Sequence, residues 1–569
     1  MSLRYLFSPL TIGNVEVKNR IYQPALIVGL SDEEGNVTPE IFDFYVERAK
    51  GGAGLIVVGG VYSDRRGKGY YGMLAMDRDE LIKQYKRLVD AMKGYGTVCL
   101  VQIMDTGRYA RTKVSGLEPV APSAVPCKLT GQTPKELTTD EVREYKRKMV
   151  EAVKRAALAG FDGVEFHAGM GYLINQFLSP LTNRRKDEYG GDIEGRMRFL
   201  IELIEESRRV TPSNFIIGCR VNMHDFIEGG NTEKEGEYIV KRLDEMGVDF
   251  ISVIEGWHES RVPLIVQEVP PAGHVELAER AKKVTDKPVV YTTRVKDPYL
   301  ANKIIAEGKA DMVGLARALI ADPYWPYKAE RGRVEEIRPC ITCSHCLSSL
   351  FNALIQGKPK PVECQVNPRL GREGGELPTI EYKKRVLVIG GGPAGLEAAL
   401  TLAKRGHDVI LVEKEREMGG MVIPASTPRY KRELIDLIKY YQTMLQKYGV
   451  RLILNHRANR NFIESLGVEE IVVATGATPK KLEVPGAQTP IVLDAIEVLK
   501  KRIRLSGRVV VCGGGETGLE VADFLSDHGA EVKVVEMYAA GQKVELTEKG
   551  PLFRRLKKKG VEIIQWTKL

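Results

Sequence analysis

The sequence predicts an α/β protein in which a parallel eight-stranded (β/α)8 (TIM) barrel precedes a Rossmann-like nucleotide-binding region. Three observations support this prediction. Short apolar runs alternate with helical patterns over residues 20–325, a glycine fingerprint occurs twice further on, and four cysteines lie between the two regions. We expect a barrel with the substrate site, a small metal-binding module with a linker, and two Rossmann-like domains, over residues 1–330, 331–380, 381–490 and 491–569.

The composition is that of an ordinary globular protein with several cores, because 43% of 569 residues are hydrophobic. The formal net charge is +9, but Lys and Arg are spread along the chain without long basic blocks, so nucleic-acid binding is not expected. The N-terminus does not resemble a signal peptide and no apolar run reaches about 18 residues, so we expect a cytoplasmic protein without a membrane span. The composition leaves the oligomeric state open, a homo-oligomer included.

The barrel is predicted from seven apolar runs that return regularly with a helical pattern between them. No glycine fingerprint follows the first runs, which favours a barrel over an open sheet. Functional groups are expected just after the carboxyl ends of such strands. The runs cover residues 54–60, 97–103, 163–167, 215–221, 250–256, 288–294 and 310–317.

The first glycine fingerprint lies in RVLVIGGGPAGLEAA, directly after an apolar strand and before a helical pattern. Glycines in this pattern let the backbone approach a pyrophosphate at a helix N-terminus, and an acidic residue after the second strand can accept from a ribose hydroxyl. The residues of this predicted dinucleotide site are Gly390, Gly392, Gly395 and Glu413.

The second fingerprint, in RVVVCGGGETGLE, predicts another dinucleotide site. Between the two lies IVVATGATP (471–479), a strand end that flavoprotein reductases use between an FAD domain and an inserted NAD domain. We therefore expect FAD at the first site and NADH at the second. The glutamate that ends this motif would repel the 2′-phosphate of NADPH and thus favours NADH. Arg554 and Arg555 are candidates for the opposite preference, because they could bind that phosphate. The residues of the second site are Gly513, Gly515, Gly518 and Glu536.

The cysteine cluster has the spacing C-x2-C-x2-C-x17-C. Four thiolates can hold tetrahedral zinc or an iron–sulfur cluster. Three cysteines in one loop with a distant fourth favour a [4Fe–4S] cluster, and the position between two flavin-type regions adds to this, because a cluster carries electrons and zinc does not. The neighbouring His345 is not required as a ligand. The predicted ligands are Cys340, Cys343, Cys346 and Cys364, whereas Cys99, Cys127, Cys219 and Cys512 are expected to be packing residues.

Several motifs are shared with one enzyme family over essentially the whole chain: NRIYQPAL, VQIMDTGR, PVAPSAVP, GYLINQFLSPLTNRRKDEYGG, GWHESRVP, ADMVGLAR and CQVNPRLG. With them the chain resembles the 2,4-dienoyl-CoA reductase and trimethylamine dehydrogenase branch of the Old Yellow Enzyme superfamily. Bile-acid-inducible NADH:flavin oxidoreductases and clostridial enoate reductases belong to the same branch. Relatives there continue beyond the position of VEIIQWTKL, so we expect the FAD- and NAD-binding region to be truncated, with the FAD site lacking one wall.

The resemblance implies an FMN site in the barrel. One glutamine binds the pyrimidine edge, one arginine lies near N1 and O2 of the ring, and two further arginines hold the phosphate. By position these residues are Pro24, Ala25, Gln102, Arg220, Arg294, Gly314 and Arg317.

The resemblance also implies catalytic residues. Tyr172 in GYLINQ matches a proton-donating tyrosine, and His258 in GWHES matches its partner histidine. His167 matches a group that binds the substrate oxygen, with a buried histidine bonded to backbone as the alternative. Two positions depart from the family pattern: Met170 replaces the second oxygen-binding group, and Asp105 replaces a histidine that can contact substrate.

The implied function is that of an NAD(P)H:flavin oxidoreductase acting on CH–CH groups. Electrons would pass from NADH through FAD and the cluster to FMN, and from there to the activated C=C bond of an enoyl- or dienoyl-CoA, enoate or enone. The partner is thus a small unsaturated carbonyl compound. One alternative is an amine dehydrogenase similar to trimethylamine dehydrogenase, which the GWHES segment disfavours. Another is an electron-transfer flavoprotein, or a zinc-stabilised binding protein, without small-molecule chemistry of its own.

Overall fold

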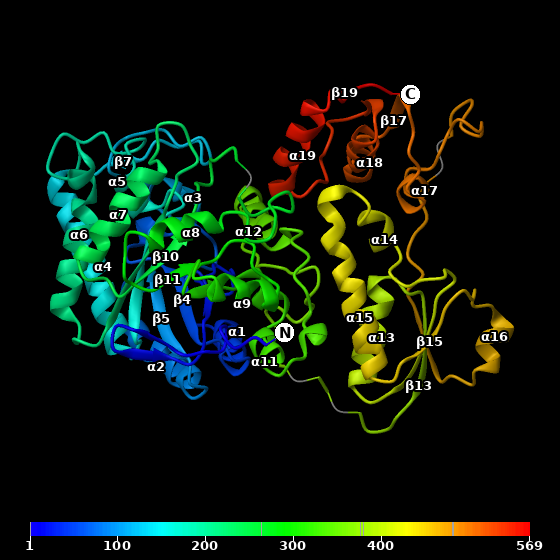
Figure 1. Ribbon diagram of the computed structural model, residues 1–569, viewed down its shortest axis with the longest axis horizontal. Helices are drawn as coiled ribbons and strands as arrows, with labels where there is room; N and C mark the ends of the chain where they lie inside the picture. The colour runs from blue at the N-terminus through cyan, green and yellow to red at the C-terminus, as the bar shows by residue number, and fades with distance from the viewer. Residues whose placement is uncertain (1, 263, 376, 379, 481–482, 569) are drawn as a thin grey trace. The chain divides into compact units, whose positions relative to one another are not determined.

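The computed structural model describes the chain except residues 1, 263, 376, 379, 481–482 and 569 (Figure 1). These residues form two compact units. The first unit comprises residues 1–265, 269–334 and 345–374, and the second comprises 266–268, 335–344 and 375–569. No helix in the described part of the chain is both long and apolar enough to span a membrane.

The first unit contains a closed barrel of eight parallel strands, which confirms the predicted fold. The barrel closes where the last strand pairs with the first, with Val313 opposite Ile21. The last two predicted runs extend beyond their strands, because residues 292–294 and 315–316 belong to the loops that follow and Arg317 begins α10. The strands, in their order around the barrel, are β3 (Ile21–Gln23), β4 (Leu55–Val61), β5 (Val98–Ile103), β8 (Gly163–Ala168), β9 (Ile216–Asn222), β10 (Phe250–Ile254), β11 (Val289–Tyr291) and β12 (Met312–Gly314).

Helices surround this barrel, as α4, α6, α7 and α8 show in Figure 1. Capping boxes start two of them, Thr138 with Glu141 and Thr232 with Glu235, so the helix boundaries are set by local sequence. The longer helices are α1 (Pro39–Lys50), α2 (Glu80–Lys93), α4 (Thr139–Leu158), α6 (Ile193–Val210), α7 (Glu233–Glu245), α8 (Val275–Lys282), α9 (Pro298–Ala306) and α12 (His345–Gln356). Shorter ones are α3 (Thr112–Ser115), α5 (Leu173–Leu178), α10 (Arg317–Ala321) and α11 (Trp325–Glu330).

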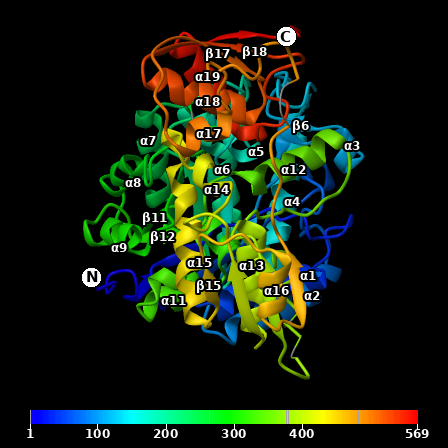
Figure 2. The same cartoon turned by 90° about the vertical axis from the view of Figure 1, so that its right-hand side faces the viewer.

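The second unit contains two parallel sheets (Figure 2). In each of them a glycine loop lies between the first strand and the helix that follows it. The first sheet has the strand order β15-β14-β13-β16 and the second β17-β18-β19, which confirms the predicted α/β character. The strands are β13 (Arg385–Ile389), β14 (Asp408–Val412), β15 (Arg451–Ile453), β16 (Glu470–Val473), β17 (Gly507–Cys512), β18 (Ala530–Val535) and β19 (Glu562–Ile564). The main helices are α13 (Pro393–Lys404), α15 (Ile435–Lys447), α18 (Glu516–Asp527) and α19 (Leu546–Lys558).

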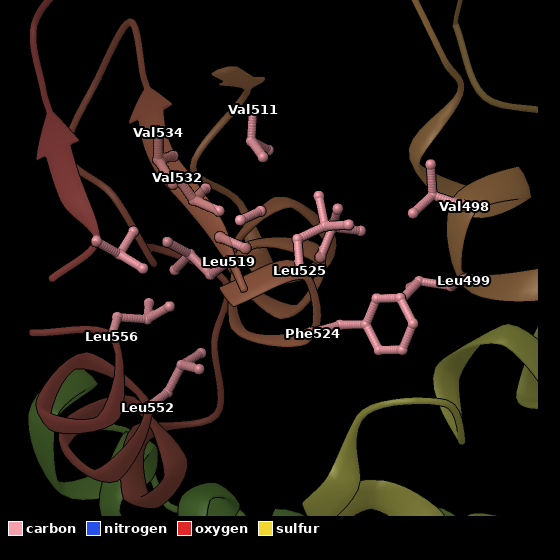
Figure 3. Close-up of a cluster of buried hydrophobic side chains, with 14 of the residues drawn as sticks. Val498, Leu499, Val511, Leu519, Phe524, Leu525, Val532, Val534, Leu552 and Leu556 are labelled. Atoms are coloured by element: carbon pink, nitrogen blue, oxygen red, sulfur yellow. The ribbon is translucent and has the colours of Figure 1, made fainter. Parts of the chain in front are cut away.

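The second sheet has its own hydrophobic core (Figure 3). Side chains from three helices, α17 (Ala495–Lys500), α18 and α19, and from strands β17 and β18 meet there, and most are almost fully buried. This burial holds the second glycine loop between β17 and α18. The residues include Leu519, Leu525, Val532, Val534, Leu552 and Leu556.

In the first unit, a loop after β4 is fixed to the end of β5. Asp105 accepts hydrogen bonds from Ser63 Oγ at 2.6 Å and from the Ser63 amide at 3.2 Å. Thr106 donates to the Gly67 carbonyl through its amide at 3.0 Å and through Oγ1 at 2.8 Å. A Cβ atom at Gly67 would lie 1.8 Å from Asp105 Oδ1, so only glycine fits there. Asp105, one of the two departures from the family pattern, thus anchors this loop.

The buried Asp105 predicts a pH-dependent stability. Burial raises the pKa of its carboxyl to about 7, above the unfolded value of about 3.9. Folded Asp105 therefore keeps a proton that the unfolded chain releases, so its stabilising contribution is full below about pH 4 and is lost as the pH rises to about 7. The loss amounts to about 4 kcal/mol.

Asp105→Asn removes this contribution and keeps an oxygen acceptor for the amides. We expect the free energy of unfolding of the variant to fall less than that of the wild type between about pH 5 and pH 8, measured by chemical denaturation. Identical slopes in the two proteins would contradict the prediction.

Candidate active site

Three side chains meet at the carboxyl end of the barrel. Tyr172 lies between β8 and α5, and His258 follows β10. The Tyr172 hydroxyl lies 2.9 Å from His258 Nε2 and 2.9 Å from the Tyr70 hydroxyl. The structure therefore brings together the two residues that the sequence motifs single out, and it adds Tyr70, which sequence reasoning missed. The available signal was the glycine-rich segment KGYYG after a barrel strand.

Burial keeps this cluster uncharged. It raises the pKa of Tyr172 well above its ordinary value and lowers the pKa of His258 to about 4. Burial also raises the pKa of Tyr70. Near neutral pH the site thus holds two protonated phenols and the neutral imidazole of His258. This imidazole can donate or accept a hydrogen bond.

His167 lies in β8 beside this cluster, with its ring centroid 4.9 Å from that of Tyr172. Its Nδ1 accepts from the Gly169 amide at 3.3 Å. Burial, with Arg220 and His258 adding to it, lowers the pKa of His167 well below its ordinary value. A neutral ring that accepts at Nδ1 carries its proton on Nε2, so His167 is bonded to backbone and can also act as a donor.

Met170 cannot serve as a second donor with its side chain. Its backbone has a φ of 55°, and its amide donates to Asn222 Oδ1 at 3.0 Å. This contact fixes the turn that leads from β8 to Tyr172.

Polar groups inside the barrel form a second cluster. Glu165 accepts from Gln102 Nε2 and from the Tyr22 hydroxyl, both at 2.5 Å. Arg220 donates to Ser252 Oγ at 3.0 Å and to Thr292 Oγ1 at 3.1 Å. Burial raises the pKa of Glu165, and Arg220 opposes this. Gln102 and Arg220 are thus held rigidly at the barrel mouth, and sequence reasoning missed the glutamate that holds Gln102.

The barrel mouth fits a flavin phosphate ester. Arg294 and Arg317 follow the last two strands, and each donates to a backbone carbonyl, of Val269 and of Ile265, at 2.8 Å. Glu255, at the end of β10, accepts from Thr293 Oγ1 at 2.6 Å. Among the described residues its second oxygen has no hydrogen-bond partner although it is buried, which a ligand hydroxyl would satisfy.

The other residues for which a flavin contact is predicted lie at the ends of barrel strands. Pro24 and Ala25 follow β3, and Gly314 ends β12. A Cβ at Gly314 would lie 2.2 Å from Thr292 Cγ2, so this strand end admits only glycine. The backbone there is open to a ligand that approaches closely.

The two glycine loops have the same construction. In the first, Glu413 accepts from the Gly391 amide at 2.6 Å, and a Cβ at Gly395 would lie 1.9 Å from the Gly390 carbonyl oxygen. Gly392 is the N-cap of α13. The closing carboxylate thus binds the loop backbone directly, and each oxygen retains a further acceptor position for a ribose hydroxyl. This geometry fits a dinucleotide.

The second loop repeats this geometry. Glu536 accepts from the Gly514 amide at 2.6 Å, and a Cβ at Gly518 would lie 1.9 Å from the Gly513 carbonyl oxygen. Gly515 is the N-cap of α18. Arg555 pairs with Glu268 at 2.9 Å and with Asp523 at 3.3 Å, so it is engaged elsewhere.

The four clustered cysteines fall in different segments. Cys340 and Cys343 lie in residues 335–344 of the second unit, and Cys346 and Cys364 lie in the first. Ser349 links the segments that carry Cys346 and Cys364. Its hydroxyl donates to the Cys346 carbonyl at 2.9 Å and accepts from the Glu363 amide at 3.2 Å. Across the described residues, no group of three or more His, Cys, Asp or Glu side chains is arranged to hold a metal ion.

Comparisons with known proteins agree with both halves of the chain. Residues 5–336 match the NADH:flavin oxidoreductase / NADH oxidase family, and residues 384–568 match the pyridine nucleotide-disulphide oxidoreductase family. An NADH oxidase from Thermoanaerobacter brockii is 41% identical over 94% of this chain and 82% of its own length. A cinnamate reductase from Clostridium sporogenes is 34% identical over 100% of this chain and 87% of its own.

A solved structure of 2-naphthoyl-CoA reductase in complex with 2-naphthoyl-CoA superposes with a TM-score of 0.96 at 33% identity. The match covers 100% of this chain and 88% of that one. With the closed barrel and the two glycine loops, these similarities show that the chain belongs to the NADH:flavin oxidoreductase / NADH oxidase family.

Proposed function

We propose that this protein is an NADH-dependent ene-reductase that reduces a C=C bond conjugated to a carbonyl group, as in an enoyl- or dienoyl-CoA, an enoate or an enone. The main support is the hydrogen bond between Tyr172 and His258 at the barrel mouth. A buried phenol beside a neutral imidazole is suited to protonating a carbon atom. The relatives named cinnamate reductase and 2-naphthoyl-CoA reductase support the same class of substrate.

Each of three barrel residues, Tyr172, His167 and His258, has its own role in the proposed reaction. The hydride for the alkene would come from reduced FMN held at the barrel mouth. Tyr172 holds the proton for the other alkene carbon at its hydroxyl oxygen. His167 can donate from Nε2 to the substrate carbonyl oxygen, where negative charge develops. His258 keeps the Tyr172 hydroxyl oriented.

Binding of FMN is assigned to seven residues of the barrel mouth. Gln102 would meet the pyrimidine edge and Arg220 the N1 and O2 side of the ring, where a buried positive charge stabilises the reduced form. The guanidinium groups of Arg294 and Arg317, after β11 and β12, would hold the phosphate. The set is Pro24, Ala25, Gln102, Arg220, Arg294, Gly314 and Arg317.

The second unit is proposed to bind FAD at the loop around Gly390 and NADH at the loop around Gly513. Cys340, Cys343, Cys346 and Cys364 are proposed as ligands of a [4Fe–4S] cluster, because four thiolates with this spacing suit such a cluster. When bound there, such a cluster would supply one-electron transfer, which zinc cannot.

Anaerobic turnover tests the proposed reaction. We expect NADH-dependent consumption of at least one alkene from a panel of cinnamates, crotonyl- and dienoyl-type thioesters and steroid enones. Tyr172→Phe lowers this rate by about 10²- to 10⁴-fold, because it removes the proton donor, and leaves the flavin content unchanged. Consumption of trimethylamine with none of the alkenes, or a variant as fast as the wild type, would refute the proposal.

Iron analysis tests the proposed cluster. Protein purified without oxygen should contain iron and show the broad visible absorption of a cluster beneath the flavin bands. Cys364→Ala should lose most of this iron. Cys512→Ala, which removes an exposed cysteine of β17, is the matched control and should retain it. Zinc in place of iron would show instead a structural metal site.

Glu536 predicts the nucleotide preference. Its carboxylate lies at the loop where the 2′-phosphate of NADPH would be placed, so kcat/KM should be higher with NADH. Glu536→Gln keeps an acceptor for the Gly514 amide and removes the charge. We expect the ratio of kcat/KM for NADH over NADPH to fall about tenfold, equivalent to about 1.4 kcal/mol. An unchanged ratio would show that the preference arises elsewhere.

A further inference from the structure

We propose that Tyr70 is a positioning residue for Tyr172: its hydroxyl donates to the Tyr172 oxygen, directs the Tyr172 proton to the substrate and stabilises the phenolate left behind. The proposal rests on the ene-reductase function proposed above. It is supported by a separate observation, which is the 2.9 Å contact between the hydroxyl oxygens of the buried Tyr70 and Tyr172.

A count of protons and lone pairs shows why a second donor matters. The Tyr172 hydroxyl has one proton and can accept two hydrogen bonds. If it donates to Tyr70 or to His258, its proton does not face the substrate. It can protonate a substrate carbon only when both neighbours donate to it. Tyr70 can fill this role at all physiological pH values, because its own proton is firmly held.

The proton balance of the step is simple. The O–H bond of Tyr172 breaks, a C–H bond forms on the substrate, and a phenolate remains. Tyr70 O–H and His258 Nε2–H then both donate to that phenolate. Water returns the proton after product leaves. Hydrogen bonds to a charged group are stronger than those between neutral groups, so the loss of one donor should be measurable as a slower reaction.

The remaining titratable groups around Tyr172 do not replace this donor. The His167 ring and the Tyr109 ring pack against it, with centroids 4.9 and 6.0 Å away. The Tyr109 hydroxyl donates to Glu259 at 2.9 Å, and Arg108 pairs with the same carboxylate. The Tyr109 hydroxyl is therefore engaged in a hydrogen bond with the Glu259 carboxylate and not with Tyr172.

The loop that carries Tyr70 is held firmly enough for such a role. Besides the contacts of Gly67 with Asp105 and Thr106, a Cβ at Gly69 would lie 2.6 Å from Thr106 Cγ2, so the segment lies directly against the end of β5. Tyr70 follows at once and is only 5% exposed. Its hydroxyl is thus placed by a chain of contacts that begins at Asp105.

Tyr70→Phe tests the proposal, since it removes one hydroxyl and keeps the ring. Alkene turnover should fall about 10- to 100-fold. The solvent deuterium isotope effect on kcat should rise, because proton transfer becomes slower. Oxidation of NADH by oxygen, which requires no protonation of carbon, should stay within about twofold of wild type. Tyr85→Phe is the matched control: it removes a buried hydroxyl that donates to the Ala75 carbonyl at 2.8 Å, and it should alter none of these values.

A double variant identifies the residue through which Tyr70 acts. In a Tyr172→Phe background, Tyr70→Phe should cause little further loss, because the group that it positions is already absent. Additive losses would overturn the proposal, as would wild-type turnover and isotope effect in the single variant, or an equal loss in the alkene and oxygen reactions. Failure of the wild type to reduce any alkene would instead refute the proposed function, and with it this inference.

Discussion

Closure of the parallel barrel is the constraint on which the candidate site depends. The pairing of β12 with β3 fixes the carboxyl ends of all eight strands at one mouth. Residues that lie 86 and 102 positions from Tyr172 in the chain, His258 and Tyr70, can therefore touch its hydroxyl. Without closure, the loops after β4, β8 and β10 would not be neighbours.

Burial then determines the chemistry available at that mouth. A low-dielectric setting disfavours charge, so the phenols keep their protons and both histidines stay neutral. Arg220 supplies positive charge nearby, and Glu165 beside it holds Gln102. Neutral hydrogen-bonding groups thus surround Tyr172, while Arg220 and Glu165 belong to the second cluster inside the barrel.

Sequence reasoning reaches the parts of this arrangement that follow from local patterns. Alternating apolar runs predict the barrel, and the two glycine loops predict the sheets of the second unit, because tight turns and close contacts demand glycine at fixed positions. Sequence motifs predict the pair Tyr172 and His258. They do not predict Tyr70, since its position depends on Asp105 and Thr106, which are distant in sequence and carry no periodic signal. The ends of β11 and β12 are also predicted too late, because the runs include the loop residues 292–294 and 315–316, among which Thr293, Arg294 and Leu315 are buried like strand residues.

The tight fit of Gly67 against Asp105 has an evolutionary consequence. A larger side chain at either position displaces the segment before Tyr70, so neither can change alone without moving the Tyr70 phenol away from Tyr172. The two positions, together with Tyr70, should be inherited as a set.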